Sequence, residues 1–422
     1  MSNRIQDVNR ERVVVTGMGQ VTALGADEDG FAARLFGGRP GIRPLRRLDA
    51  GAYRTGTGAE LDDDVLAAAL KPAGARRHDR TVALALAVSG QALEQAGLTD
   101  GNGPQEPRET GTIFGSGYGP SHSTGAAYEA FHTRGPAGMR PTSVPRCMVN
   151  AISSQVSIAF RLTGPNYAVV ASCASSTVAI GLAFRMIRDG YAERVLCGGV
   201  ETMFDPVVYA AWDRLRVMTP NPDPRACFRP FDLARDGFVL GEGAGALVLE
   251  RLGSARSRNA RIRAELCGYG ESSDAEHITR PSVAGQVRAM RAALDCAGMT
   301  PEHIDLVNAH GTATKASDEA ESQSVRAVFG DALRRTTVVS SKPFFGHLIG
   351  ASGVVEAIAT ILCLESGRVH ANLNLDHPDP VCDLPFAGPA ACDVAVSAAM
   401  SNSFGFGGSN GVLILRKFEG EP

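Results

Sequence analysis

The sequence predicts an α/β protein in which two successive β/α halves share one chain, and three observations lead to this fold class. Short apolar runs rich in β-branched residues alternate with longer segments of helical composition. The polar stretch at 252–262 interrupts this alternation, which then restarts. At 422 residues the chain is also longer than one simple core usually supports. We therefore expect an N-terminal half over residues 1–255 and a C-terminal half over residues 256–422.

In the N-terminal half, strands are expected where apolar runs lead into glycine or small residues. The predicted strands cover 12–19, 111–119 with a glycine-rich turn at its end, 166–172 as a short buried strand, 193–199, and 238–250 as a pair. Helical composition predicts helices at 81–96 and 175–187. Residues 120–146 carry Gly, Pro, Ser and Thr with few apolar repeats, so we expect a long excursion around a pocket or an interface.

The C-terminal half repeats the alternation. Strands are predicted at 262–268, 304–309, 338–341, 393–396 and 411–416, and helices at 282–297, 318–329 and 353–365. Sequence identity between the two halves is too weak to prove a duplication.

Composition excludes several classes of protein. The chain is 44% hydrophobic and 21% charged with a formal net charge of -3, and its arginines are dispersed, so we expect no nucleic-acid partner. No stretch approaches 18 apolar residues and the first ten residues are polar, so we expect no membrane span and a cytoplasmic location. Nine cysteines without a Cys-x-x-Cys pair predict reduced thiols, with neither a disulfide framework nor a metal site.

Cys173 lies where the predicted strand at 166–172 gives way to the predicted helix at 175–187. The free backbone N–H groups and the positive dipole end of a helix N-terminus favour a thiolate over a thiol. The two residues on either side are all Ala or Ser, which keeps the approach to the sulfur open. The pattern predicts a nucleophile, with a buried structural cysteine as the alternative.

Two histidines follow predicted strands of the C-terminal half and lie in glycine-containing loops. One is in Val307-Asn-Ala-His310-Gly-Thr312-Ala-Thr314, and the other is in Ser340-Ser-Lys342-Pro-Phe-Phe-Gly346-His347, ahead of a helix that holds Glu356. A lone histidine is usually structural or solvated, and we expect this of the other seven. His310 and His347 are the expected partners of the nucleophile.

These segments, together with Asn402-Ser-Phe-Gly-Phe406-Gly-Gly-Ser-Asn410 and Arg229-Pro-Phe-Asp232, resemble the β-ketoacyl-acyl-carrier-protein synthases of type II fatty acid and polyketide systems. The resemblance runs in the family's order from about Val13 to the C-terminus. It implies the thiolase-like fold, in which two mixed sheets lie within a five-layered α/β/α/β/α stack.

The resemblance also implies a decarboxylative condensation. Cys173 would accept an acyl chain from the phosphopantetheine arm of an acyl carrier protein, and no other cofactor is implied. His310 and His347 would then assist decarboxylation of a malonyl unit. Backbone N–H groups of Cys173 and Phe406 would form the oxyanion hole. Family members are dimers, so the resemblance implies a homodimer or a heterodimer with a chain-length-factor-like subunit.

The resemblance assigns supporting roles to further residues. Lys342 would pair with Glu356 and order the His347 loop. Thr312 and Thr314 match the hydroxyls that bind the pantetheine amides. Phe406 matches a gate whose neighbouring glycines permit movement. Tyr118 aligns with the lining of the acyl pocket. A basic cluster is either a docking patch for an acidic carrier protein or a solvated helix end (Arg76, Arg77, Arg80).

Two rival functions receive less support from the residues. Thiolases pair their nucleophile with a second cysteine in a C-terminal glycine loop, and residues 402–410 contain none. A chain-length-factor subunit lacks the nucleophile, whereas Cys173 and both histidines are present. Composition and Tyr118 favour a polyketide pathway with a chain-length-factor partner, and a housekeeping fatty acid synthase is the alternative.

Overall fold

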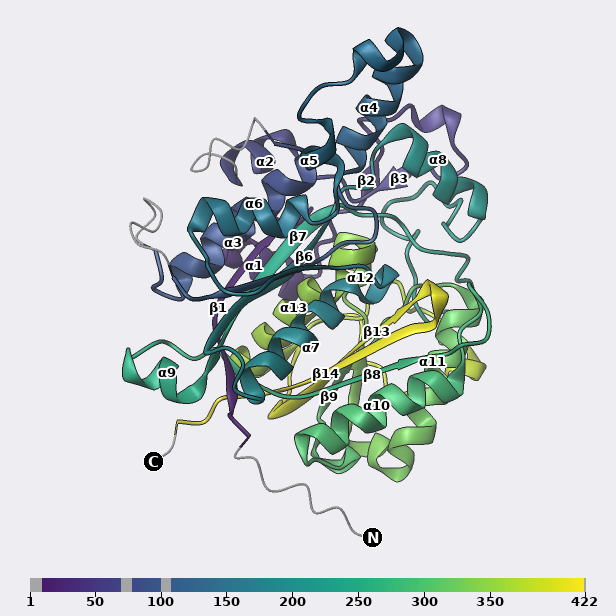
Figure 1. Cartoon of the computed structure of the whole chain (residues 1–422). Coiled ribbons are helices and arrows are strands. Elements are labelled where there is room, and N and C mark those ends of the chain that lie inside the picture. Colours follow the sequence, from purple (N-terminus) through teal and green to yellow (C-terminus); the bar gives the residue numbers. More distant parts are fainter. Residues whose placement is uncertain (1–9, 70–77, 100–107, 421–422) are drawn as a thin grey trace.

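The computed structural model describes residues 10–69, 78–99 and 108–420, and its centre is a ten-stranded mixed sheet in the order β10-β9-β13-β14-β8-β1-β7-β6-β4-β5 (Figure 1). The strands of the N-terminal half are β1 (Val13–Val21), β4 (Gly111–Gly115), β5 (Asn166–Val169), β6 (Arg194–Glu201) and β7 (Gly243–Arg251). Those of the C-terminal half are β8 (Ala264–Ser273), β9 (Leu306–Asn308), β10 (Thr337–Val339), β13 (Ala398–Gly405) and β14 (Ser409–Arg416).

The two halves share one topology, which the sequence did not reveal. Counted from the middle of the sheet outward, each half places its first, fifth, fourth, second and third strand in that order. The halves meet where β1 pairs with β8 in antiparallel register, with Val13 opposite Leu266. Because β7 ends at Arg251 and β8 begins at Ala264, a boundary near 255 fits this repeat, and the predicted domain limits stay a prediction.

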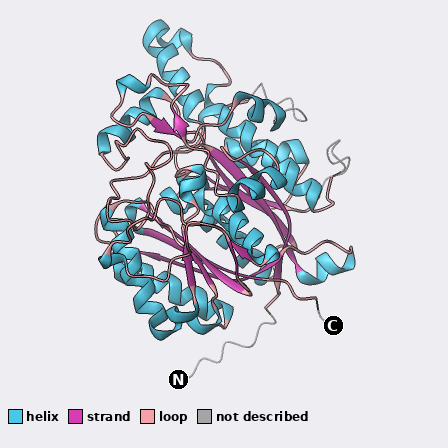
Figure 2. Cartoon of the chain, turned by 180° about the vertical axis from the view of Figure 1, so that it is seen from behind, coloured by secondary structure: helices cyan, strands magenta, loops and turns pink. Residues whose placement is uncertain are grey.

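Helices complete five layers (Figure 2). The central layer consists of α7 (Ser175–Arg188) and α13 (Ser352–Ser366), which pack against strands of both halves. The outer face of the N-terminal half is covered by α3 (Arg80–Gln95) and α6 (Ala151–Phe160), and that of the C-terminal half by α10 (Val283–Ala297) and α11 (Lys315–Phe329). The predicted helices at these positions, α6 excepted, are confirmed to within a few residues.

The central helix α13 belongs to a stretch that is longer and more apolar than the sequence analysis expected of any segment. Residues 349–366 form an apolar helical stretch long enough by length and composition to cross a membrane, although no such stretch was expected. However, 89% of this stretch is buried inside the fold, so it fits a core helix enclosed between the two halves of the sheet. The two mixed sheets that the resemblance implied are joined into one ten-stranded sheet by the pairing of β1 with β8.

The remaining elements include several that the sequence analysis missed or misplaced. The excursion at 120–146 is largely helical, because α4 (Ser121–Arg134) and α5 (Ser143–Cys147) form there. The strand predicted at 393–396 is instead the two-residue β12 (Cys392–Asp393), paired with β11 (Arg368–Val369) outside the main sheet. Smaller elements are α1 (Glu28–Phe36), β2 (Arg43–Pro44), β3 (Thr57–Gly58), α2 (Asp63–Ala69), α8 (Pro206–Leu215), α9 (Leu252–Ser257) and α12 (Lys342–Phe345).

The strand β5 differs from the prediction of a short buried strand. It lies at the edge of the sheet, ends at Val169, and leaves Tyr167 53% exposed. Edge position rather than local sequence explains the exposure, because one row of its backbone groups has no neighbouring strand among the described residues.

Candidate active site

Cys173 lies on a sharp turn between β5 and α7. Ser172 adopts a left-handed backbone conformation with φ of 49°, and residues 172–174 form one 3-10 turn before α7 begins at Ser175. The Ser175 hydroxyl stabilises this turn, since it accepts from the Ala171 N–H at 2.9 Å and donates to the Ser172 carbonyl at 2.7 Å. The turn places the sulfur at the N-terminal end of a 14-residue helix.

His347 reaches the sulfur from the C-terminal half. Its Nε2 lies 3.2 Å from Cys173 Sγ and its Nδ1 lies 2.8 Å from Ser352 Oγ. The backbone of His347 is fixed by the N-terminal half, because its N–H donates to Val239 and its carbonyl accepts from Gly241. The ring is therefore oriented by both halves of the molecule.

His310 follows β9 and contacts the same space. Its ring centroid lies 5.5 Å from that of His347, with the ring planes 84° apart. Lys342 Nζ lies 3.2 Å from His310 Nδ1 and also forms a buried ion pair with Glu356. The predicted Lys342–Glu356 pair is thus confirmed, and the structure adds the contact with His310.

Burial sets the protonation of these groups. Burial raises the pKa of the Cys173 thiol to about 12, although the charge of Lys342 and the backbone N–H of Phe406 act in the opposite direction. Burial and the charge of Lys342 lower the pKa of His310 and of His347 well below the ordinary value. At neutral pH the site therefore holds a thiol beside two neutral imidazoles, and the expected thiolate at the helix N-terminus is wrong for the resting site.

Neutral His347 can adopt either of two tautomers, and each gives the ring a different role beside Cys173. With the proton on Nδ1, the ring donates to Ser352 Oγ and Nε2 can accept the Cys173 proton. With the proton on Nε2, the Ser352 hydroxyl donates to Nδ1, and the ring presents a donor where a thioester oxygen would lie.

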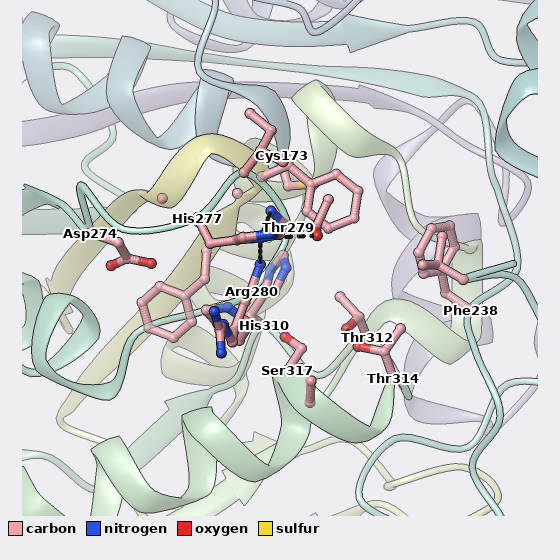
Figure 3. A pocket seen from close by; sticks show the side chains of 18 of the residues that line it. Cys173, Phe238, Asp274, His277, Thr279, Arg280, His310, Thr312, Thr314 and Ser317 are labelled. Atoms are coloured by element: carbon pink, nitrogen blue, oxygen red, sulfur yellow. Dashed lines mark hydrogen bonds between the residues drawn. The ribbon is translucent and has the colours of Figure 1, made fainter. Parts of the chain in front are cut away.

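Two cavities meet at Cys173. The first, of about 250 Å³, is lined by both histidines, Thr312 and Thr314. Figure 3 shows these two threonines side by side in it, and their hydroxyls are 3.1 Å apart. The second, of about 410 Å³, contains no histidine and is lined by Tyr118, whose place in an acyl pocket stays a prediction. The roles of these hydroxyls stay predictions.

Phe406 lies between the two cavities and lines both. The following Gly407 and Gly408 have φ of 80° and 76°, a conformation that favours glycine. A Cβ at Gly405 would come within 3.1 Å of Cys173 N, so the chain before Phe406 runs against the nucleophile turn. The Phe406 N–H also donates a hydrogen bond toward the Cys173 sulfur and lowers the pKa of the thiol. This contact supports the predicted oxyanion hole.

Buried carboxylates position these loops, and the sequence analysis assigned them no role. Glu321 accepts hydrogen bonds from the N–H groups of His310 and Gly311, at 2.8 and 2.9 Å. Glu201 accepts from Gly117 and Tyr118 N–H in the loop after β4. Glu201 comes just after the predicted strand at 193–199 and Glu321 lies within the predicted helix at 318–329, so an acidic residue at each place was the available signal.

The predicted docking cluster is only partly described. Arg76 and Arg77 lie outside the described residues. Arg80 is at the start of α3, where it donates two hydrogen bonds to the fully buried Glu242, at 2.7 and 2.9 Å. Because a buried carboxylate needs such a partner, Arg80 is a structural ion-pair residue, which corrects its place in the cluster.

Comparison with known proteins agrees with this geometry. The models of the family described as "Beta-ketoacyl synthase", N-terminal and C-terminal domain, match residues 10–255 and 263–376. The chain belongs to the β-ketoacyl synthase family. It is a condensing acyltransferase.

Curated relatives of this β-ketoacyl synthase align over nearly its whole length. It is 38% identical to "3-oxoacyl-[acyl-carrier-protein] synthase 2" of Coxiella burnetii, over 97% of this chain and 99% of the relative. It is 37% identical to the protein of the same name from Synechocystis sp., over 98% of this chain and 100% of the relative.

Solved structures confirm the thiolase-like fold of the synthase. "The ishigamide ketosynthase/chain length factor" matches with a TM-score of 0.89 and 34% identity, over 97% of this chain and all of that chain. A β-ketoacyl synthase from Burkholderia phymatum gives the same TM-score, identity and coverage. A type II polyketide ketosynthase in complex with its acyl-carrier protein, "AntDE:AntF", matches with a TM-score of 0.88 and 25% identity, again over 97% of this chain and all of that chain.

The sulfur of Cys173 and ring nitrogens of His310 and His347 all lie within 4.8 Å of one another, which is also a spacing that a metal ion accepts. The sequence analysis expected no metal here. A metal-bound thiolate would not be available to form a thioester, so the acyltransferase reaction needs this sulfur free.

Proposed function

We propose that this synthase condenses an acyl chain, held as a thioester on Cys173, with a malonyl unit on an acyl carrier protein, and that it does so in a type II polyketide pathway. The observation that carries the proposal is the 3.2 Å contact between Cys173 Sγ and His347 Nε2, with His310 beside it in the same cavity.

In the first stage the Cys173 thiol attacks an acyl carrier thioester. The thiol proton passes to His347 Nε2, the acyl carbon bonds to Cys173 Sγ, and the pantetheine thiol leaves with a proton. The negative charge on the tetrahedral oxygen is met by the N–H groups of Cys173 and Phe406, and one such donor is worth about 3 kcal/mol. Thr312 and Thr314 line the cavity through which the pantetheine arm enters.

In the second stage a malonyl thioester occupies the cavity that contains the two histidines. Its carboxylate leaves as CO₂, and the electron pair forms an enolate whose oxygen accepts hydrogen bonds from His310 and His347. The enolate carbon attacks the Cys173 thioester, the new carbon–carbon bond forms, and Cys173 leaves as a thiolate that takes up a proton. Lys342 contacts His310 Nδ1 and fixes that ring's orientation.

A separate part of the proposal is the choice between polyketide synthesis and fatty acid elongation. Tyr118 lines the second cavity, where its ring shortens the space available to an acyl chain and adds a hydroxyl. This favours a polyketide-type substrate, and the similarity to a ketosynthase/chain length factor pair is consistent with it. Housekeeping fatty acid elongation by a homodimer is the second candidate, favoured by the 37–38% identity to 3-oxoacyl-[acyl-carrier-protein] synthases. In both cases we place the reaction in the cytoplasm.

A second subunit is part of the proposal. The edge strand β5 leaves Tyr167 53% exposed, and Val170 beyond it is 60% exposed. On the neighbouring helical insertion Tyr128 and Val144 are 65% and 69% exposed. An unpaired edge together with exposed apolar side chains suits a partner that extends the sheet. The partner is a chain-length-factor-like subunit in the polyketide pathway and a second copy in the alternative.

Carrier docking is assigned to the basic residues before α3. Since Arg80 is paired with Glu242, we propose Arg76 and Arg77 as the residues that contact an acidic carrier protein.

The test is mass spectrometry of Cys173 after incubation with a panel of acyl carrier thioesters. Acylation of Cys173, followed by CO₂ release and loss of the adduct on addition of malonyl carrier, supports the condensation. An unlabelled Cys173 with every carrier would overturn it. Preference for oxygen-bearing or short chains separates the polyketide pathway from fatty acid elongation, in which saturated chains of increasing length are all accepted.

A further inference from the structure

The second cavity at Cys173 is the space left for the acyl chain during condensation. Both histidines line the first cavity, and the malonyl unit must lie against them when it loses CO₂. The chain on Cys173 therefore has to extend into the second cavity, on the other side of Phe406. The character of that cavity selects the substrate.

Aromatic rings form much of the wall of this second cavity. Trp212, on α8, stacks on Phe406 with ring centroids 5.9 Å apart and planes at 21°. The Tyr118 ring lies 6.3 Å from the Trp212 ring. Ala211, Leu215 and Ile349 add apolar side chains to the lining. Trp212 and Leu215 also line the first cavity. These rings suit a narrow, flat chain better than a thick or branched one.

One polar group in this wall has no partner. Trp212 is only 6% exposed, and its indole Nε1 is fully buried without any hydrogen bond. Buried indole N–H groups usually find an acceptor. Burial raises the pKa of Tyr118, and the nearby Trp212 N–H lowers it, so the N–H points toward the Tyr118 hydroxyl. The two groups are nevertheless not placed well enough to form a hydrogen bond. The N–H is thus directed toward a side chain that lines the second cavity.

We propose that Trp212 is a specificity-determining residue, whose indole N–H, together with the Tyr118 hydroxyl, hydrogen-bonds an oxygen on the acyl chain held by Cys173. The substrate class is an acyl thioester with a ketone or hydroxyl oxygen on the chain. This inference rests on the proposed condensation and deepens it by naming the chemistry of the chain.

The physical reason is a difference between chains of equal length. A fully saturated chain fills the cavity and leaves the buried N–H without an acceptor, whereas an oxygen-bearing chain satisfies it. Sites built to hydrogen-bond a substrate reject analogues that lack the matching group, because the buried polar group is then left unpaired. The sequence offered no sign of this, since a tryptophan on an amphipathic helix is usually core.

The experiment compares acylation of Cys173 by hexanoyl, 3-oxohexanoyl and 5-oxohexanoyl pantetheine thioesters. For the unaltered enzyme we expect kcat/KM to favour at least one oxo chain over hexanoyl by about tenfold, which corresponds to about 1.4 kcal/mol. Trp212→Phe keeps a stacked ring but removes the N–H, and should reduce that ratio to within about threefold of unity. Tyr118→Phe should reduce it by a smaller factor.

The control is Tyr191→Phe, since Tyr191 is 81% exposed and lines a separate pocket to which Cys173 does not contribute. In Tyr191→Phe, the ratio of kcat/KM for the oxo chains to kcat/KM for hexanoyl should equal that of the unaltered enzyme. An unaltered enzyme without preference for either oxo chain, or a preference that survives in Trp212→Phe, would overturn the inference. If no thioester, hexanoyl included, acylates Cys173, the proposed condensation itself fails. The ratio is measured within each variant, so partial loss of folded protein does not alter it.

Discussion

The two halves of the molecule use the same topology for different chemistry, and the segments before the central helices show how. In the N-terminal half β5 ends at Val169 and α7 begins at Ser175, so five residues connect them. In the C-terminal half β10 ends at Val339 and α13 begins at Ser352, so twelve residues connect them. The short connection presents only Cys173, whereas the long one carries Lys342 and His347. The repeated fold thus places two helix N-termini together, and the proposed nucleophile lies on the shorter of the two connections.

The halves also differ in their buried charges. Cys173 lies among apolar and small neighbours, and burial keeps it a thiol. Around the histidines, Lys342, Glu356 and Glu321 are all buried, and burial raises the pKa of Glu356 to about 7 against the effect of Lys342. In the proposed reaction the first half therefore supplies the covalent bond to the acyl chain, and the second half supplies the hydrogen bonds and the charge around it.

The largest effect should come from Cys173→Ala, which removes the role of the N-terminal half altogether. We expect no acyl adduct and no measurable condensation, because the variant lacks the thiol that the proposal assigns to the thioester. Intact-protein mass spectrometry after incubation with acyl carrier measures the adduct. Cys392→Ala, at an exposed cysteine, is the control and should label as the unaltered enzyme does. An adduct of equal yield in Cys173→Ala would show that the nucleophile is elsewhere.

His347→Ala should separate the two halves kinetically. We expect decarboxylation of malonyl carrier to fall by about 10²–10⁴-fold, and acylation of Cys173 to fall less. Release of labelled CO₂ and single-turnover adduct formation measure the two stages. Equal losses in both stages would mean that His347 serves both stages to the same extent, and an unchanged rate of CO₂ release would remove it from the second stage.

Lys342→Met should destabilise the C-terminal half. It leaves Glu356 buried without its partner, and breaking a buried pair in this way costs about 3–5 kcal/mol of unfolding free energy. Urea denaturation measures the change. The double variant Lys342→Met, Glu356→Gln should recover part of the loss. A single variant as stable as the original enzyme would show that the pair contributes no stability.

The pH dependence should reveal the depressed pKa values of the histidines. An imidazole with a pKa of about 6.5 is roughly three-quarters protonated at pH 6, whereas His310 and His347, with pKa values well below that, stay neutral. We therefore expect the rate of CO₂ release to stay level between pH 7.5 and 6. A fourfold fall over that range would contradict it. Since the unfolded chain takes up these protons first, the contribution of the two histidines to stability falls as the pH drops below about 6.5.

The smallest effect is expected from Tyr118→Ala, which enlarges the cavity of the N-terminal half. Each additional buried CH₂ is worth about 0.8 kcal/mol, so kcat/KM for longer saturated chains should rise by roughly fourfold per carbon relative to hexanoyl. Competition between acyl carriers of different length measures the shift. Tyr191→Ala serves as the matched control, and an identical chain-length profile in both variants would remove Tyr118 from the acyl cavity.

The sequence by itself determined the β/α alternation, the family, and the positions of Cys173, His310 and His347 at the ends of strands. These depend on local patterns: Cys173 between a strand and a helix, and His310 and His347 in glycine loops after strands. The helical excursion and the closing strand β13 were misjudged, because polar helices without apolar repeats and strands that run into glycine loops give weak local signals.

Only the tertiary structure decided the rest, because it depends on which segments come together. The 3.2 Å contact of Cys173 with His347 joins residues 174 positions apart. Enclosure, rather than sequence neighbours, keeps Cys173 a thiol and the histidines neutral. The pairing of Arg80 with Glu242 and the unpartnered N–H of Trp212 likewise follow from packing between distant elements, which no local pattern of residues encodes.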